Sequence, residues 1–122
     1  MARVAIVGVG AIGGAIAGLL EQGGHELTLC TRRPLERLTV TTPSGAVRVK
    51  VRNLTSPAQA APADWVIVAT KAYDSEAAAK WFPALCAKGA PVAIVQNGVE
   101  HRERFSSYVD EQRLLPVVID YL

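Results

Sequence analysis

The fold is decided by residues 3–14, RVAIVGVGAIGG, in which an apolar run leads directly into a cluster of glycines. The run before the glycines is rich in β-branched side chains and is typical of a buried strand. Gly8, Gly10 and Gly13 then form the pattern G-x-G-x-x-G, and residues 11–22 continue as an Ala-, Leu- and Ile-rich helix. A strand, this glycine pattern and a helix in direct succession are typical of a dinucleotide-binding α/β unit.

Each glycine of the pattern has a physical task. Gly8 permits the tight turn, Gly10 lets the backbone approach a pyrophosphate, and Gly13 lets the helix pack closely on its strand. The unpaired amides at the helix start, with the positive end of the helix dipole behind them, would face the phosphates. A glycine turn that serves close packing alone is the alternative. The residues expected to bind the pyrophosphate are Gly8, Val9, Gly10, Ala11, Ile12 and Gly13.

Length and composition indicate one domain over residues 1–122. Half of the residues are hydrophobic and the mean hydropathy is +0.22. We expect a sheet buried on both faces and, in addition, some apolar surface that meets a partner. The net charge of +2 is too small to indicate a nucleic-acid partner. No apolar run approaches the roughly 18 residues of a membrane span, and no signal peptide is evident, so we expect a cytoplasmic protein without a membrane segment.

The rest of the chain alternates strands and helices, which predicts a Rossmann-type, doubly wound and mostly parallel sheet. A helix over residues 76–88 should be kinked or split by Pro83. Cys30 and Cys86 have no metal-like spacing, so we expect two buried thiols and no metal site. Strands are predicted at residues 3–7, 26–30, 65–69, 91–95 and 114–120, helices at 11–22 and 100–109, and a helical turn within 56–62.

A β-hairpin is predicted between the second strand and the next crossover. Residues 38–42 and 46–52 alternate apolar and polar side chains around a Pro-Ser-Gly turn. Arg48, Lys50 and Arg52 would then lie on the solvated face of the second arm of this hairpin.

The end of the second strand should select the nucleotide. An NAD-binding domain usually has a carboxylate there for the ribose diol, whereas this chain has Thr31, Arg32 and Arg33. A guanidinium binds a 2′-phosphate through charge-assisted hydrogen bonds worth ~1.5–3 kcal/mol, which favours NADP roughly ten- to a hundredfold. We expect Arg32 to make this contact, helped by Thr31 or Arg33. The alternative is that the arginines only solvate a loop.

Two polar residues follow consecutive core strands. Lys71 comes after the strand at 65–69, and Asn97 comes after the strand at 91–95. Ligands of open α/β sheets bind outside the carboxyl ends of the strands, so both side chains should point toward the nicotinamide end of the cleft. Taken singly, Lys71 is typical of an exposed loop charge and Asn97 of a turn. Their joint occurrence favours a functional role.

Together these segments resemble the N-terminal domain of the ketopantoate reductase family, essentially over the whole chain. The resemblance rests on residues 8–14, Arg32, residues 68–74 and residues 96–99. It implies NADPH-dependent reduction of 2-dehydropantoate, or of a related 2-keto acid, on the pathway to pantothenate. It also implies that Lys71 and Asn97 lie beside the nicotinamide and its ribose in supporting catalytic roles. Asp120 and Tyr121 depart from the family pattern.

The resemblance further implies a general-acid lysine contributed by a C-terminal helical domain, which has no counterpart among the 122 residues. We therefore expect NADPH binding with little turnover by this chain alone. The surface that would meet the absent domain should be apolar and could support a homodimer. Two alternatives are a different β-hydroxyacid-type dehydrogenase domain and a nucleotide-sensing regulatory Rossmann module. Arg32 argues against the sensor, which usually keeps an acidic ribose binder.

Overall fold

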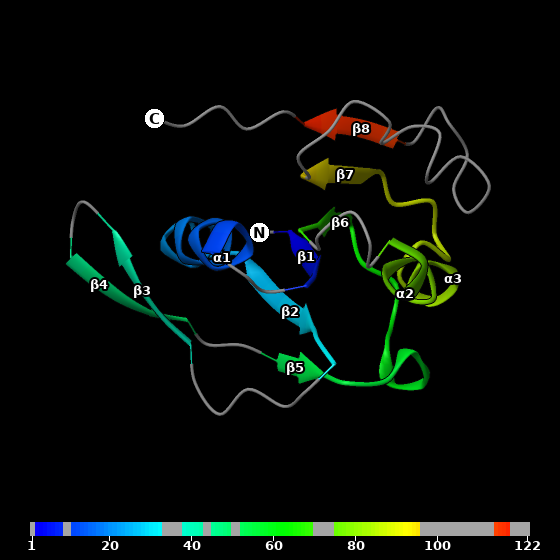
Figure 1. Cartoon of the computed structure of the whole chain (residues 1–122), viewed down its shortest axis with the longest axis horizontal. Helices are drawn as coiled ribbons and strands as arrows, with labels where there is room; N and C mark the ends of the chain where they lie inside the picture. Colours follow the sequence, from blue (N-terminus) through cyan, green and yellow to red (C-terminus); the bar gives the residue numbers. More distant parts are fainter. Residues whose placement is uncertain are drawn as a thin grey trace.

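The computed structural model describes residues 2–8, 11–32, 38–42, 45–49, 52–69, 75–95 and 114–117, some of them by their backbone alone. Six strands form the main sheet: β1 (Arg3–Val7), β2 (Glu26–Cys30), β5 (Arg52–Leu54), β6 (Trp65–Val68), β7 (Val92–Val95) and β8 (Leu114–Val117). They lie in the order β5-β2-β1-β6-β7-β8, and every pair is parallel (Figure 1). When the six strands of this sheet are numbered by their place in the sequence, the order is 3-2-1-4-5-6. This is the strand order of the doubly wound dinucleotide-binding fold, and it confirms the predicted fold class.

Helices cover both faces of this sheet (Figure 1). Helix α1 (Ala11–Gln22) packs on one face, and the short helices α2 (Ser75–Ala79) and α3 (Phe82–Leu85) pack on the other. A 3-10 helix, η1 (Pro57–Gln59), lies in the link from β5 to β6 and corresponds to the predicted helical turn. The antiparallel hairpin of β3 (Leu38–Thr42) and β4 (Gly45–Val49) lies against α1.

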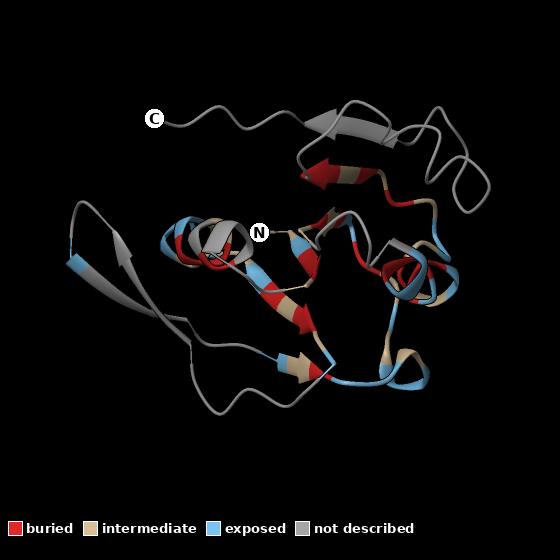
Figure 2. Ribbon diagram, in the orientation of Figure 1, coloured by how far each residue is buried: buried red, intermediate tan, exposed pale blue. Residues whose placement is uncertain are grey.

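The core is double because each central strand is buried on both faces (Figure 2). Along β1, Val4 and Ile6 belong to the cluster beneath α1, whereas Ala5 and Val7 belong to the cluster beneath α3. This alternation explains why the strand has no polar residue after Arg3. The α1 cluster also contains Ala17, Leu27 and Leu29, and the α3 cluster also contains Val66, Val68, Phe82, Leu85, Val92 and Ile94.

Helix α1 ends where the paired glycines predicted its end. Gly24 has a φ of 78° and donates its N–H to the carbonyl of Glu21 at 3.1 Å. The N–H of His25 reaches the carbonyl of Leu20 at 3.2 Å, which completes a Schellman motif. The turn sends the chain directly into β2, whose predicted bounds are confirmed.

Pro83 divides the helical segment after β6, as predicted. Helix α2 ends at Ala79, and a second helix, α3, begins at Phe82 with Pro83 in its first turn. A proline is tolerated at that position because its missing N–H would have no partner within the helix. The helix also ends earlier than predicted, since residues 86–88 form a turn before Gly89, whose φ is 85°.

The predicted second arm of the hairpin is wrong in its bounds. Strand β4 ends at Val49, and Arg52 begins β5, which pairs with β2 in the main sheet. Arg48 and Arg52 therefore lie in different strands, so the three basic residues do not all lie on the second arm of the hairpin as predicted, and Lys50 itself lies outside the described residues. The physical reason is that residues 52–54 gain parallel pairing with β2. The predicted helix at 100–109 and the end of the last strand at 118–120 lie outside the described residues.

We predict that Phe82→Ala lowers the free energy of unfolding by about 3–5 kcal/mol, because this side chain is 2% exposed and its loss leaves a cavity beneath the sheet. Leu19→Ala, at a position that is 61% exposed, should change it by less than about 0.5 kcal/mol. Urea unfolding of both variants checks this. Equal losses would contradict the assignment of the core.

Candidate functional site

The candidate site lies where β1, β2 and β6 end side by side. Val7 is in register with Cys30 on one side and with Val68 on the other. Helix α1, which follows β1 in the sequence, packs on one face of the sheet, and α2, which follows β6, packs on the opposite face (Figure 1). In doubly wound sheets, ligands usually bind outside the carboxyl ends of the strands at the point where neighbouring strands lead to helices on opposite faces.

Gly8 forms the first turn of this edge. Its φ of 86° lies in the left-handed region that favours glycine, and its N–H donates to the carbonyl of Cys30 at 2.9 Å. Helix α1 begins at Ala11 with no acidic residue in its first turn, so no carboxylate competes with an anion for its amides. Val9 and Gly10 lie outside the described residues, and Ala11, Ile12 and Gly13 are described as helical backbone only.

The end of β2 is held by β5. Thr31 donates its N–H to the carbonyl of Leu54 at 3.0 Å, and its hydroxyl lies 2.9 Å from Nδ2 of Asn53. The same Nδ2 lies 3.1 Å from the carbonyl of Leu29. Arg32 is the next residue after Thr31, and it is exposed. Thr31 and Arg32 therefore stand where the sequence predicted them, beside the end of the second strand.

Sequence reasoning missed Asn53. The predicted hairpin ends at Arg52, and Asn53 belongs to no predicted element. In the structure both residues belong to β5, a strand of only three residues. One signal was present: asparagine is depleted in strands, so its place between Arg52 and the buried Leu54 called for a polar partner.

Lys71 and Asn97 lie outside the described residues, as do Arg33, Asp120 and Tyr121. What the structure places is the pair of strand ends that precede them. Ala69 extends the ladder past β6 by donating its N–H to the carbonyl of Val7 at 2.9 Å, and β7 ends next to β6 at Val95. Strands β6 and β7 thus both end at the carboxyl edge of the sheet, and the positions of the Lys71 and Asn97 side chains stay predictions.

Both cysteines are free thiols. Cys30 is buried in the cluster beneath α3, and burial raises the pKa of its thiol to about 12. Cys86 is half-buried after α3, so the prediction of two buried thiols holds fully only for Cys30. Among the described residues there is no cluster of His, Cys, Asp and Glu that could hold a metal ion. Nor does any described helix have the length and apolarity to cross a membrane.

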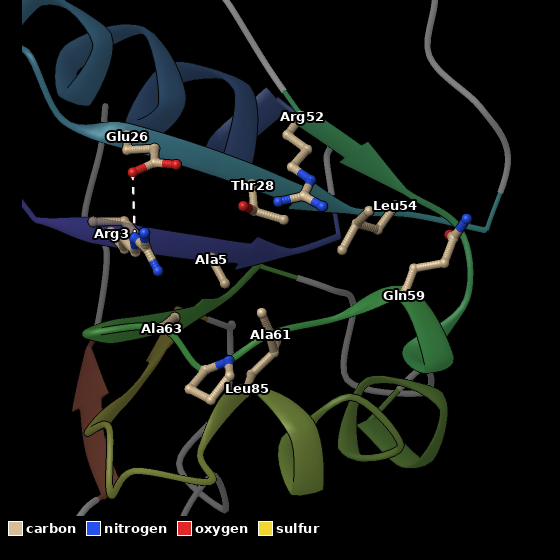
Figure 3. A pocket seen from close by; sticks show the side chains of 12 residues that line it. Arg3, Ala5, Glu26, Thr28, Arg52, Leu54, Gln59, Ala61, Ala63 and Leu85 are labelled. Atoms are coloured by element: carbon tan, nitrogen blue, oxygen red, sulfur yellow. Dashed lines mark ion pairs between the residues drawn. The ribbon is translucent and has the colours of Figure 1, made fainter.

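A small hollow lies elsewhere, under the α3 face of the sheet (Figure 3). It has a volume of about 80 Å³, well below what a dinucleotide fills. An exposed ion pair between Arg3 and Glu26, at 3.3 Å, spans its rim at the starts of β1 and β2. The hollow extends from this rim to Arg52 and Leu54 of β5 and to the link that follows it.

Comparison with known proteins gives a consistent family. The model of the family described as ketopantoate reductase PanE/ApbA matches residues 4–121. A 2-dehydropantoate 2-reductase of Caulobacter vibrioides is 45% identical over 121 residues, which cover 98% of this chain and 42% of that protein. The crystal structure of a PanE/ApbA family ketopantoate reductase from Ralstonia eutropha has a TM-score of 0.80 at 33% identity and is likewise covered over 42% of its length, with 98% of this chain.

A 2-dehydropantoate 2-reductase from Geobacter metallireducens has a TM-score of 0.83 at 25% identity, with 93% of this chain and 40% of that chain covered. The chain thus spans about two fifths of the length of these relatives.

We predict that Gly8→Ala costs roughly 1–2 kcal/mol of stability, because an L-residue is strained at this φ. It should also weaken dinucleotide binding by about tenfold or more, since the strained turn shifts the backbone that leads into α1. Calorimetric titration with NADPH checks the affinity.

Gly24→Ala is the matched control, because Gly24 has a similar φ of 78° but lies at the opposite end of α1. It should lose similar stability and keep its affinity. Equal affinities in the two variants would show that the Gly8 turn does not hold the nucleotide.

Proposed function

The chain belongs to the ketopantoate reductase PanE/ApbA family, and on that premise we propose that it is the NADPH-binding part of an oxidoreductase that reduces a 2-keto acid to the 2-hydroxy acid. The substrate that we propose is 2-dehydropantoate, which names the activity of the relatives from Caulobacter vibrioides and Geobacter metallireducens. The family match favours this function over a different β-hydroxyacid-type dehydrogenase and over a nucleotide-sensing module.

One observation carries the cofactor assignment: the Gly8 turn is hydrogen-bonded to the end of β2, directly before Thr31 and Arg32. A dinucleotide whose pyrophosphate lies at the start of α1 would extend its adenosine ribose toward this strand end. An exposed guanidinium there attracts a 2′-phosphate, and neither of the two residues is a carboxylate that would repel it.

Bound NADPH would supply the hydride that passes to the keto carbon. Backbone amides at the start of α1 would hold the pyrophosphate and Arg32 the 2′-phosphate. Lys71 and Asn97, which follow β6 and β7, would hold the nicotinamide end and the substrate through polar contacts. A cationic acid must then protonate the alkoxide that develops on the substrate, and the resemblance assigns this role to a lysine of the C-terminal domain of the family.

A homodimer and a cytoplasmic location remain proposals. Among the described large apolar side chains, Leu19 on α1 and Trp65 at the start of β6 are exposed, at 61% and 43%. Exposed apolar side chains of this kind are available to a partner, whether a second copy of the chain or another domain.

We predict that Arg32→Ala lowers the affinity for NADPH about ten- to a hundredfold and leaves the affinity for NADH nearly unchanged, because only NADPH carries the 2′-phosphate. Titrations of the full chain with each cofactor measure both values. Arg52→Ala removes the same charge from an exposed residue at the start of β5 and serves as the control. If Arg32→Ala leaves the NADPH/NADH affinity ratio unchanged, the assignment of Arg32 to the 2′-phosphate is wrong.

We predict that the 122 residues alone oxidise NADPH very slowly with 2-dehydropantoate, because they span 42% of the Caulobacter relative and the resemblance assigns the general acid to the C-terminal domain of the family. A spectrophotometric assay with and without the keto acid, after binding has been shown by titration, measures this. Rapid turnover that depends on 2-dehydropantoate would show that the chain contains its own acid.

A further inference from the structure

Asn53 occupies an unusual place for a polar residue. It is the central residue of β5, an outer strand of the main sheet, and its side chain is half-buried. Leu54 next to it belongs to the cluster beneath α3, so alternation along the strand turns Asn53 toward the α1 face. Leu29, which is in register with Asn53, belongs to the α1 cluster as well.

The orientation of its amide is fixed by hydrogen-bond chemistry. Nδ2 of Asn53 lies 3.1 Å from the carbonyl oxygen of Leu29, which can only accept. The NH₂ group must therefore face that carbonyl, and its second proton is directed at Oγ1 of Thr31, 2.9 Å away. Thr31 is thus the acceptor in this contact, and the proton of its own hydroxyl is directed away from Asn53.

This direction matters for the nucleotide. A 2′-phosphate presents only acceptor oxygens to its partners when it is ionised, whereas a ribose 2′-hydroxyl also donates. A threonine hydroxyl that accepts from Asn53 can donate its own proton to a phosphate oxygen. We propose that Asn53 is a positioning residue for NADPH selectivity, which acts by presenting the Thr31 hydroxyl as a donor to the 2′-phosphate beside Arg32. The proposal rests on the proposed NADPH-binding function.

The backbone strengthens the link between β5 and this position. Thr31 donates its N–H to the carbonyl of Leu54 at 3.0 Å. Consecutive residues of β5 therefore hold the main chain and the side chain of Thr31 at once. Because Arg32 is the next residue, the same contacts fix the point from which its exposed side chain extends.

The test is a double-mutant cycle in the full chain, with NADPH and NADH affinities measured by calorimetry. Asn53→Ala and Thr31→Val should each lower the NADPH/NADH affinity ratio about three- to tenfold, as expected for one lost hydrogen bond. In the Thr31→Val background, Asn53→Ala should have no further effect on the ratio, since its effect passes through the hydroxyl. Thr31→Ser keeps the hydroxyl and should keep the ratio.

Gln59→Ala is the structural control. Its Oε1 accepts two backbone N–H groups, from Thr55 and Ser56, so this variant loses as many hydrogen bonds just after β5. It should lose stability without a change in the ratio. Asn53→Val, which favours a strand but cannot donate, replaces the alanine variant if that variant does not fold.

The outcomes separate the two proposals. A ratio that falls in the Asn53 variants and does not fall further in the Thr31→Val background supports the inference. An Asn53 variant that weakens NADPH and NADH equally, or that lowers the ratio as strongly in the Thr31→Val background, overturns it and leaves the NADPH function in place. A wild-type chain with no preference for NADPH overturns both.

Discussion

Burial of the central strands on both faces is the constraint on which the remaining geometry depends. Val4 and Ile6 must find partners under α1 while Ala5 and Val7 find theirs under α3. Two layers of helix can meet this demand only if the chain crosses from one edge of the sheet to the other after each strand. The strands then run parallel, and their carboxyl ends meet at one edge. The meeting of the carboxyl ends of β1, β2 and β6 thus follows from how the core is buried.

At that edge the contacts that hold the ends of the strands together are mostly backbone hydrogen bonds. The N–H groups of Gly8, Thr31 and Ala69 each bond to a neighbouring strand one residue beyond the regular ladder. These contacts hold the first residue after each strand in place without using its side chain. The Asn53 amide adds side-chain hydrogen bonds to the carbonyl of Leu29 and the hydroxyl of Thr31. Through these bonds the three-residue strand β5 holds the end of β2.

The sequence predicted the first unit well and later segments less well, for identifiable reasons. β1, α1 and β2 have the predicted bounds, because the glycines before α1 and after it are strong local signals. β5 was missed because it has three residues, two of them polar, and owes its existence to pairing with β2. The contact between Asn53 and Thr31 joins residues 22 apart, and no local pattern contains that register. Thr31 and Arg32 could be selected as candidates from the sequence because strand ends in this fold have known roles, and their contact with a nucleotide stays a prediction.

The burial of the Cys30 thiol in the cluster beneath α3 has a practical consequence. A thiol whose pKa is raised to about 12 holds almost no thiolate at neutral pH, and the thiolate is the species that electrophiles and peroxides attack. Burial and the raised pKa thus disfavour reaction of Cys30 with such reagents, although its carbonyl accepts the N–H of Gly8 in the turn before α1. Cys86, on the α3 side and half-buried, is the better point for attaching a fluorescent or spin label. A probe there would report on the chain while leaving the carboxyl edge of the sheet untouched.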